Sequence, residues 1–216
     1  MSQVFSRRAN AIARGSLIGF ILFIVVLGTA YWVYIRSPLF TGVGSAPPQP
    51  VPFSHQLHAG DLGIDCRYCH TTVQTSAFAG MPDTKTCMNC HTIVKNTSPL
   101  LAPVRESFQT GKAIQWTRVN NLPDYVYFDH SIHVNKGIGC SSCHGQVDKE
   151  PFMAKGASLQ MGFCVNCHMH PETQVRPLDQ VFNMSWQPPA NQAQVGAQLV
   201  QQYHIQSKIS CSVCHR

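Results

Sequence analysis

All ten cysteines of this 216-residue chain fall into five C-x-x-C pairs, and a histidine follows every pair. This is the pattern of c-type haem attachment, in which two thiols three positions apart form thioethers to one porphyrin and the next imidazole binds its iron. Zinc ribbons and disulfides also use paired cysteines, but neither requires a histidine after each pair. The sequence therefore predicts five c-type haems, with thioethers from Cys66, Cys69, Cys87, Cys90, Cys140, Cys143, Cys164, Cys167, Cys211 and Cys214 and proximal iron ligands His70, His91, His144, His168 and His215.

An uncharged run of twenty residues, 16–35, is long enough to cross a bilayer as a helix. Arginines at 7, 8 and 14 precede it, and no acidic residue occurs before Asp61. The basic N-terminus is therefore expected in the cytoplasm and the rest of the chain on the periplasmic side. A cleaved signal peptide is the alternative, but the apolar run is longer than its usual core and bulky aromatic residues follow. We expect residues 1–36 to form a cytoplasmic N-terminus and a single-pass anchor in a bacterial cytoplasmic membrane.

The remainder divides into a Pro/Gly-rich tether, 37–52, and a haem-binding region, 53–216. The pattern F-x-H-x-x-H precedes the first motif and recurs, at a similar distance, before the third. Each copy is followed by a second motif, which indicates an internal duplication of segments 53–91 and 128–168. Residues 190–216 are interpreted as a half-unit, with a helix containing Tyr203 and His204 ahead of the fifth motif.

A region of this size with five haems has few side chains left for a core of its own. The porphyrins are expected to be the apolar core, wrapped by short helices and loops, so the fold class is mainly α and irregular with little β structure. Between the copies, Ser98-Pro99 and Gly111 predict a helix over residues 99–109. The role of this insert, 92–127, is left open.

Six further histidines are available as distal iron ligands. In each F-x-H-x-x-H the two imidazoles are three residues apart and share a helix face, so they can reach two different irons and hold those haems close together. Four distal ligands are assigned this way: His55, His58, His130 and His133. The fifth is Met153 or His204, with Met161, Met81 and His170 behind them, since methionine also ligates haem iron. A vacant position, which could bind a substrate, is the remaining alternative.

The formal charge is +6. About ten haem propionates would outweigh it, and no basic cluster interleaved with aromatic residues suggests nucleic acid. Charged residues are sparse, 16 basic and 10 acidic, which favours permanent burial in a complex.

Several features together resemble the pentahaem cytochrome c subunit of bacterial alternative complex III, a quinol oxidoreductase. They are the anchor, the tether, the repeated F-x-H-x-x-H, Leu122-Pro123-Asp124-Tyr125 ahead of the second copy, Cys143-His144-Gly145, and Met161-Gly162 leading into the fourth motif. The layout of the motifs is shared with small class III multihaem cytochromes, whose fold it implies.

The resemblance implies an electron carrier that is not itself an enzyme. Its implied partners are polytopic quinol-binding membrane subunits, an iron–sulfur, molybdopterin-enzyme-like subunit and a monohaem cytochrome c subunit, with a soluble cytochrome c, a copper protein or a terminal oxidase as acceptor. A self-sufficient membrane-anchored multihaem quinol dehydrogenase and a periplasmic multihaem reductase with one open haem remain as alternatives, as does an unpartnered electron store.

Overall fold

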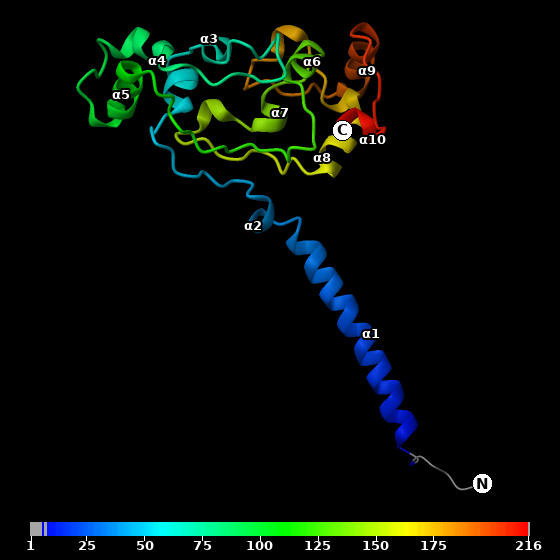
Figure 1. The fold of residues 1–216 in the computed structure, drawn as a ribbon. Coiled ribbons are helices and arrows are strands. Elements are labelled where there is room, and N and C mark those ends of the chain that lie inside the picture. The colour runs from blue at the N-terminus through cyan, green and yellow to red at the C-terminus, as the bar shows by residue number, and fades with distance from the viewer. Residues whose placement is uncertain (1–5, 7, 216) are drawn as a thin grey trace. The chain divides into compact units, whose positions relative to one another are not determined.

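The computed structural model describes residues 6 and 8–215. The arginine at 7, part of the basic N-terminus expected in the cytoplasm, lies outside the described residues. The chain forms two compact units, Met1–Val43 and Gly44–Arg216. The first contains α1 (Ala9–Tyr34) and the short α2 (Pro38–Thr41) (Figure 1). Helix α1 is long and apolar enough to cross a membrane and none of its side chains is buried. It contains nearly all of the run predicted as the anchor.

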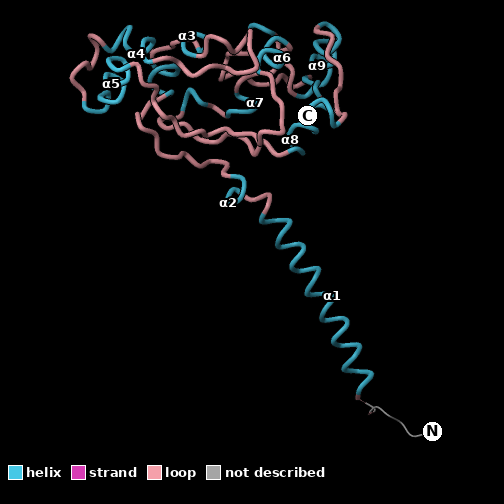
Figure 2. Tube along the Cα trace, in the orientation of Figure 1, coloured by secondary structure: helices cyan, strands magenta, loops and turns pink. Residues whose placement is uncertain are grey.

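Short helices separated by long loops make up the second unit, as Figure 2 shows. They are a π-helical turn (Gln56–Asp61), α3 (Cys66–Cys69), α4 (Thr84–His91), α5 (Ala102–Thr110), α6 (His130–Asn135), α7 (Ser141–His144), α8 (Met161–Met169), α9 (Gln192–Gln202) and α10 (Cys211–Cys214). The described residues contain no β-strand; isolated bridges join Val126 to His215 and Ile138 to Val175. The mainly helical and irregular fold class expected from the sequence is confirmed.

Every C-x-x-C-H motif lies on or beside one of these helices: α3, α4, α7, α8 and α10. One helical turn brings positions i and i+3 to the same face, which is the placement that two thioethers to one porphyrin need. Aspartates begin two of the turns: Asp65 accepts a hydrogen bond from the backbone N–H of Arg67 and Asp83 from that of Thr86, both at 2.8 Å.

Apolar side chains form only small clusters in this unit. One is built on Val73, Val134 and Val181. The other consists of Val51, Met88 and Val104, with Ile114 and Trp116 packed against it. The second cluster joins the tether, the second haem motif and the insert, so the insert 92–127 packs over the helix that carries the second motif.

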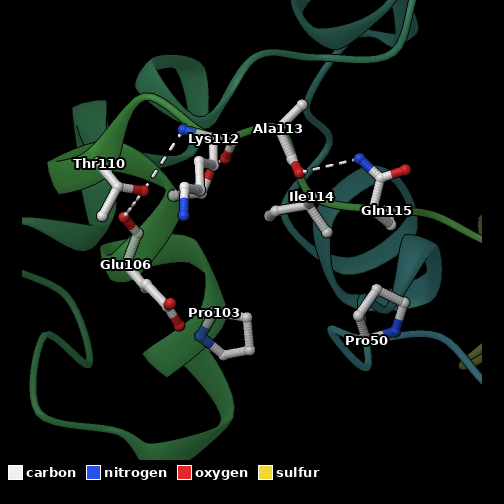
Figure 3. A pocket seen from close by; sticks show the side chains of 9 residues that line it. Pro50, Pro103, Glu106, Thr110, Lys112, Ala113, Ile114 and Gln115 are labelled. Atoms are coloured by element: carbon white, nitrogen blue, oxygen red, sulfur yellow. Dashed lines mark hydrogen bonds between the residues drawn. The ribbon is translucent and has the colours of Figure 1, made fainter.

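The insert also holds the tether through polar contacts. The Gln49 side chain pairs with the backbone of Thr117, accepting from its N–H and donating to its carbonyl, both at 2.9 Å, and the Thr117 hydroxyl donates to the Pro48 carbonyl. A shallow pocket of about 200 Å³ lies between Pro50 and α5 (Figure 3). None of its lining residues is a cysteine or histidine, so it is separate from the haem motifs.

The helix predicted within the insert is confirmed in type and position. A 3₁₀ turn, Pro99–Leu101, leads into α5, and Gly111, in the left-handed region at φ 71°, ends it.

The tail helix differs from the expectation, because it ends at Gln202 and leaves Tyr203 and His204 outside. His204 has φ 51°. Its N–H bonds to the Gln201 carbonyl and that of Ile205 to the Val200 carbonyl, which together form a Schellman motif. His204 thus terminates the helix instead of extending it.

Truncating Val104, which is 2 % exposed, tests whether the insert stabilises this end of the unit. Val104→Ala removes two methyl groups from a closed cluster and is expected to lower the free energy of unfolding by about 1–2 kcal/mol. Thermal unfolding of the detergent-solubilised full chain, followed by circular dichroism, measures it. Leu100→Ala, a larger truncation at a 62 % exposed position, is the control; equal effects of the two changes would contradict the packing role.

Candidate haem-binding site

The two F-x-H-x-x-H segments have nearly the same ring geometry. The phenylalanine stacks on the second histidine with ring centroids 4.4 Å apart in both, at interplanar angles of 25° for Phe53–His58 and 29° for Phe128–His133. It meets the first histidine edge-on, at 4.9 and 4.8 Å. The phenylalanine therefore fixes both imidazoles of its segment.

The residue after each phenylalanine supports the second imidazole in the same way. The backbone carbonyls of Ser54 and Asp129 accept from Nδ1 of His58 and His133, at 2.8 and 2.7 Å. Their side chains cap the turn that follows, where Ser54 Oγ accepts from the N–H of Leu57 at 3.1 Å. Asp129 Oδ1 accepts from the backbone N–H of Ser131 at 2.8 Å. The hydrogen bond from the Ser131 hydroxyl has the largest effect in lowering the pKa of the Asp129 carboxyl, and the backbone hydrogen bonds lower it further.

Three of the four histidines expected as distal ligands face motif histidines at one recurring separation. Ring centroids are 6.2 Å apart for His58 and His91, 6.4 Å for His130 and His144, and 6.1 Å for His133 and His168. Two imidazoles that bind one metal ion from opposite sides, each through a nitrogen about 2 Å away, have centroids about 6 Å apart. The two histidines of the second segment have different partners, as the shared-face argument predicts.

His55 belongs with His70 by the same correspondence. In the second copy, His130 faces the third motif and His133 faces the fourth. In the first copy His58 faces the second motif, which leaves the first motif to His55. Burial lowers the pKa of His55 to about 4, and the charges of His70, His58 and His144 lower it further, with His70 the largest of the three.

Backbone carbonyls hold the other ring nitrogen of most of these histidines. Nδ1 lies 2.7 Å from the Gly80 carbonyl in His70, 2.9 Å from that of Val94 in His91, and 2.8 Å from that of Ala77 in His130. A ring that donates its Nδ1–H to a carbonyl presents an unprotonated Nε2, which is the nitrogen that binds a metal. The chain thus sets both the tautomer and the orientation of the imidazoles.

In His144, Nδ1 contacts a side chain and not a backbone carbonyl. Its Nδ1 lies 3.0 Å from the amide of Asn120, whose Oδ1 is buried without a partner. Turning that amide over would let Oδ1 accept the Nδ1–H of His144, which leaves Nε2 unprotonated. Burial, followed by the charges of His130 and His70, lowers the pKa of His144 to about 4. Burial likewise lowers the pKa of His133.

The two copies support each other at their junction. The backbone N–H of Gln56, in the first F-x-H-x-x-H, bonds to the Glu150 carbonyl at 3.0 Å, and that of Ser131, in the second, bonds to the Ser76 carbonyl at 3.2 Å. Each acceptor lies in the loop that follows the first motif of the opposite copy. The halves are therefore interlocked, with the first and third motifs at the centre.

Contacts between segments bring successive motifs together. Asn89 of the second motif donates to the Tyr68 hydroxyl of the first at 3.1 Å. Arg67 of the first motif lies 4.6 Å from the Phe182 ring, and the backbone N–H of Cys140 in the third motif bonds to the adjacent Val181 carbonyl at 3.2 Å.

The other end of the unit is joined in the same way. The rings of His130 and His133, on one helix, face the third and the fourth motif. Ser207, ahead of the fifth motif, donates to the His168 carbonyl of the fourth at 2.7 Å. Figure 1 shows α4 at one end of this unit and α10 at the other.

The surroundings of the fifth motif were only partly anticipated. The ring facing His215 is that of Tyr125, with centroids 5.8 Å apart, and the Tyr127 N–H bonds to the Cys214 carbonyl. Of the two candidate distal ligands, Met153 is half-buried and His204 is exposed. The two tyrosines come from the end of the insert, and sequence reasoning had given them no role.

Comparison with known proteins agrees with this site. Residues 51–110 match the family model of cytochrome c7 and related cytochrome c. A protein of Nitratidesulfovibrio vulgaris named menaquinone reductase, multiheme cytochrome c subunit, is 28 % identical over 201 residues, which cover 91 % of this chain and 88 % of that protein. The helical and irregular unit with its paired histidines is thus similar to multihaem cytochromes c, and the chain has one candidate N-terminal membrane helix among its described residues.

Proposed function

We propose that this chain carries five c-type haems and relays electrons as a subunit of a quinone-linked membrane oxidoreductase of the alternative complex III kind. The observation that carries the proposal is the set of imidazole pairs about 6 Å apart, each containing a motif histidine. The name of the relative links such a subunit to menaquinone reduction, whereas alternative complex III oxidises quinol. Both place a multihaem relay between a quinone and another redox partner.

The ring separations fit three iron atoms with two axial imidazoles each, and the correspondence between the two F-x-H-x-x-H segments supports a fourth. The proposed pairs are His55 with His70, His58 with His91, His130 with His144, and His133 with His168. His215 is the proximal ligand at the fifth motif, and Met153 or His204 completes it. The ten cysteines are unpaired thiols, available for the thioethers. When bound, haem iron alternates between ferric and ferrous forms and so carries one electron at a time.

The residues around each pair act by positioning. Carbonyl acceptors on Nδ1 keep Nε2 directed at the metal position, and the stacked phenylalanines restrict the rings. Because the two histidines of one F-x-H-x-x-H serve neighbouring motifs, one short helix holds two adjacent sites together. The motif order second, first, third, fourth, fifth therefore makes a continuous path with two distinct ends.

The proposed setting is the periplasmic face of a bacterial cytoplasmic membrane, with α1 as the anchor. The proposed partners are polytopic quinol-binding subunits, an iron–sulfur, molybdopterin-enzyme-like subunit and a monohaem cytochrome c subunit, with a soluble carrier or terminal oxidase as acceptor. The sparse charge of the chain supports burial in such an assembly.

Isolation of the chain from gently solubilised membranes tests this setting. We expect a C-terminally tagged chain to co-purify with a large iron–sulfur protein and polytopic membrane proteins, identified by mass spectrometry. A chain that purifies alone and accepts electrons directly from quinol would overturn the proposal in favour of the self-sufficient quinol dehydrogenase.

His130→Ala tests the pairing of axial ligands. The change removes the imidazole that faces His144, so one haem of the five should lose its sixth ligand and shift from low to high spin, because alanine offers no donor. Electron paramagnetic resonance and absorption spectra measure the shift. Ile132→Ala, at a 59 % exposed position on the same helix, is the matched control. Unchanged low-spin signals in the His130→Ala protein would rule out this pair.

The fifth distal ligand is tested by two separate variants, Met153→Ala and His204→Ala. We expect one of them to change the axial-ligand spectrum of a single haem, because only one side chain can fill the sixth position opposite His215. Near-infrared absorption distinguishes methionine from histidine ligation. Spectra identical to wild type in both variants would exclude both side chains.

A further inference from the structure

A buried, uncompensated arginine lies behind the third haem motif. Arg176 is 4 % exposed, and its backbone N–H bonds to the Gly137 carbonyl at 2.9 Å. Buried charges are normally paired with an opposite charge. In the described part of the chain the ion pairs join other residues, Arg67 to Asp65 and His170 to Glu172. No described carboxylate neutralises Arg176.

Neutral groups of the third motif hold the guanidinium in place. Its Nη2 donates to the hydroxyls of Ser141 and Ser142, both at 3.2 Å, and these serines are the two residues between Cys140 and Cys143. Its Nη1 donates to the Asn183 carbonyl at 3.4 Å, and the Trp186 ring lies 4.4 Å from Cζ. Hydroxyls, a carbonyl and an aromatic face solvate the cation but leave its charge in place.

The remaining side of the guanidinium is closed. Nε has no hydrogen-bond partner, and the group lies directly against Gly139, where an added Cβ would overlap Cζ, Nη1 and Nε. This close approach accounts for glycine at position 139. A side chain at position 139 therefore could not place a carboxylate beside Nε.

The first motif has the same place in the first copy as the third motif has in the second. An arginine is also present there, but its environment differs from that of Arg176. Arg67 stands between Cys66 and Cys69, but its side chain is 50 % exposed and forms an ion pair with Asp65 at 2.7 Å. Its charge is both compensated and screened by water, so it acts weakly at a distance. The charge of Arg176 is neither compensated by a carboxylate nor screened by water. It lies close enough to Cys140 to oppose the rise that burial causes in the pKa of that thiol.

We propose that Arg176 raises the reduction potential of the haem at the third motif above that of the haem at the first. Reduction adds one electron and lowers the local charge by one, with no bond made or broken, so a fixed positive charge nearby favours the reduced form. The inference rests on the proposed attachment of a haem at this motif. Because the first and third motifs contact the adjacent residues Phe182 and Val181, the haem at the first motif is affected next, and less strongly.

Arg176→Met and Arg176→Lys in the full-length, haem-loaded chain test the proposal. Haem content is measured first; fewer than five haems in the wild-type protein would count against the proposed function, separately from this inference. Spectroelectrochemical titration then gives the midpoint potentials. In Arg176→Met one midpoint should move to more negative potential by the equivalent of about a tenfold change in the ratio of reduced to oxidised haem. In Arg176→Lys, which keeps the charge, it should stay close to wild type at neutral pH.

Arg67→Met is the matched control and should leave all midpoints nearly unchanged. If the Arg176→Met protein does not retain its haems, the proposal is tested by measuring the pH dependence of the midpoint potential in Arg176→Lys. A buried ammonium loses its proton more readily than a guanidinium, so the same midpoint should fall with pH more steeply than in wild type. The proposal is overturned if Arg176→Met moves no midpoint, if both substitutions move it equally at neutral pH, or if the Arg176→Lys midpoint follows the wild-type pH dependence.

Discussion

Pairs of imidazoles about 6 Å apart are the constraint on which the haem-motif region depends. Each pair joins a histidine that is fixed to its cysteines by one helical turn with a histidine from a distant segment, as His130 joins His144. Little else could hold these loops, since the buried apolar clusters contain three residues each. In the proposed haem-loaded protein, iron–imidazole bonds and porphyrin surfaces replace the side-chain core that a chain of this length would otherwise need.

The sequence predicted the parts whose chemistry is local. The single helical turn that carries each cysteine pair, the shared helix of His130 and His133, the apolar run of α1 and the stop at Gly111 all depend on spacing within a few residues. The contacts that arrange those parts join distant segments and have no signature of their own. Asn120 beside His144 and Tyr125 beside His215 are examples. The tail helix was predicted too long because left-handed backbone at His204, a residue without the freedom of glycine, is not evident from the sequence.

In the proposed relay, the two predicted copies build a path that is symmetric in outline. The first and third motifs meet at the centre, and the backbone bonds from Gln56 to Glu150 and from Ser131 to Ser76 are exchanged between the halves. The ends differ, since the second motif is packed by the insert and the tether through Met88 and Val104, whereas the fourth is followed by the fifth. The insert and the C-terminal segment therefore give the two ends different surfaces.

A path that is symmetric in outline takes its direction from residues that differ between the two halves. Arg176 is such a residue, and it places an uncompensated charge at one of the two central motifs only. Burying a guanidinium without a carboxylate partner costs several kcal/mol, and the serines, Trp186 and Gly139 reduce that cost without cancelling the charge. A charge that served only packing could be replaced by an apolar side chain of similar size at a gain in stability. Its retention behind the third motif is explained if the electron held there is stabilised by it.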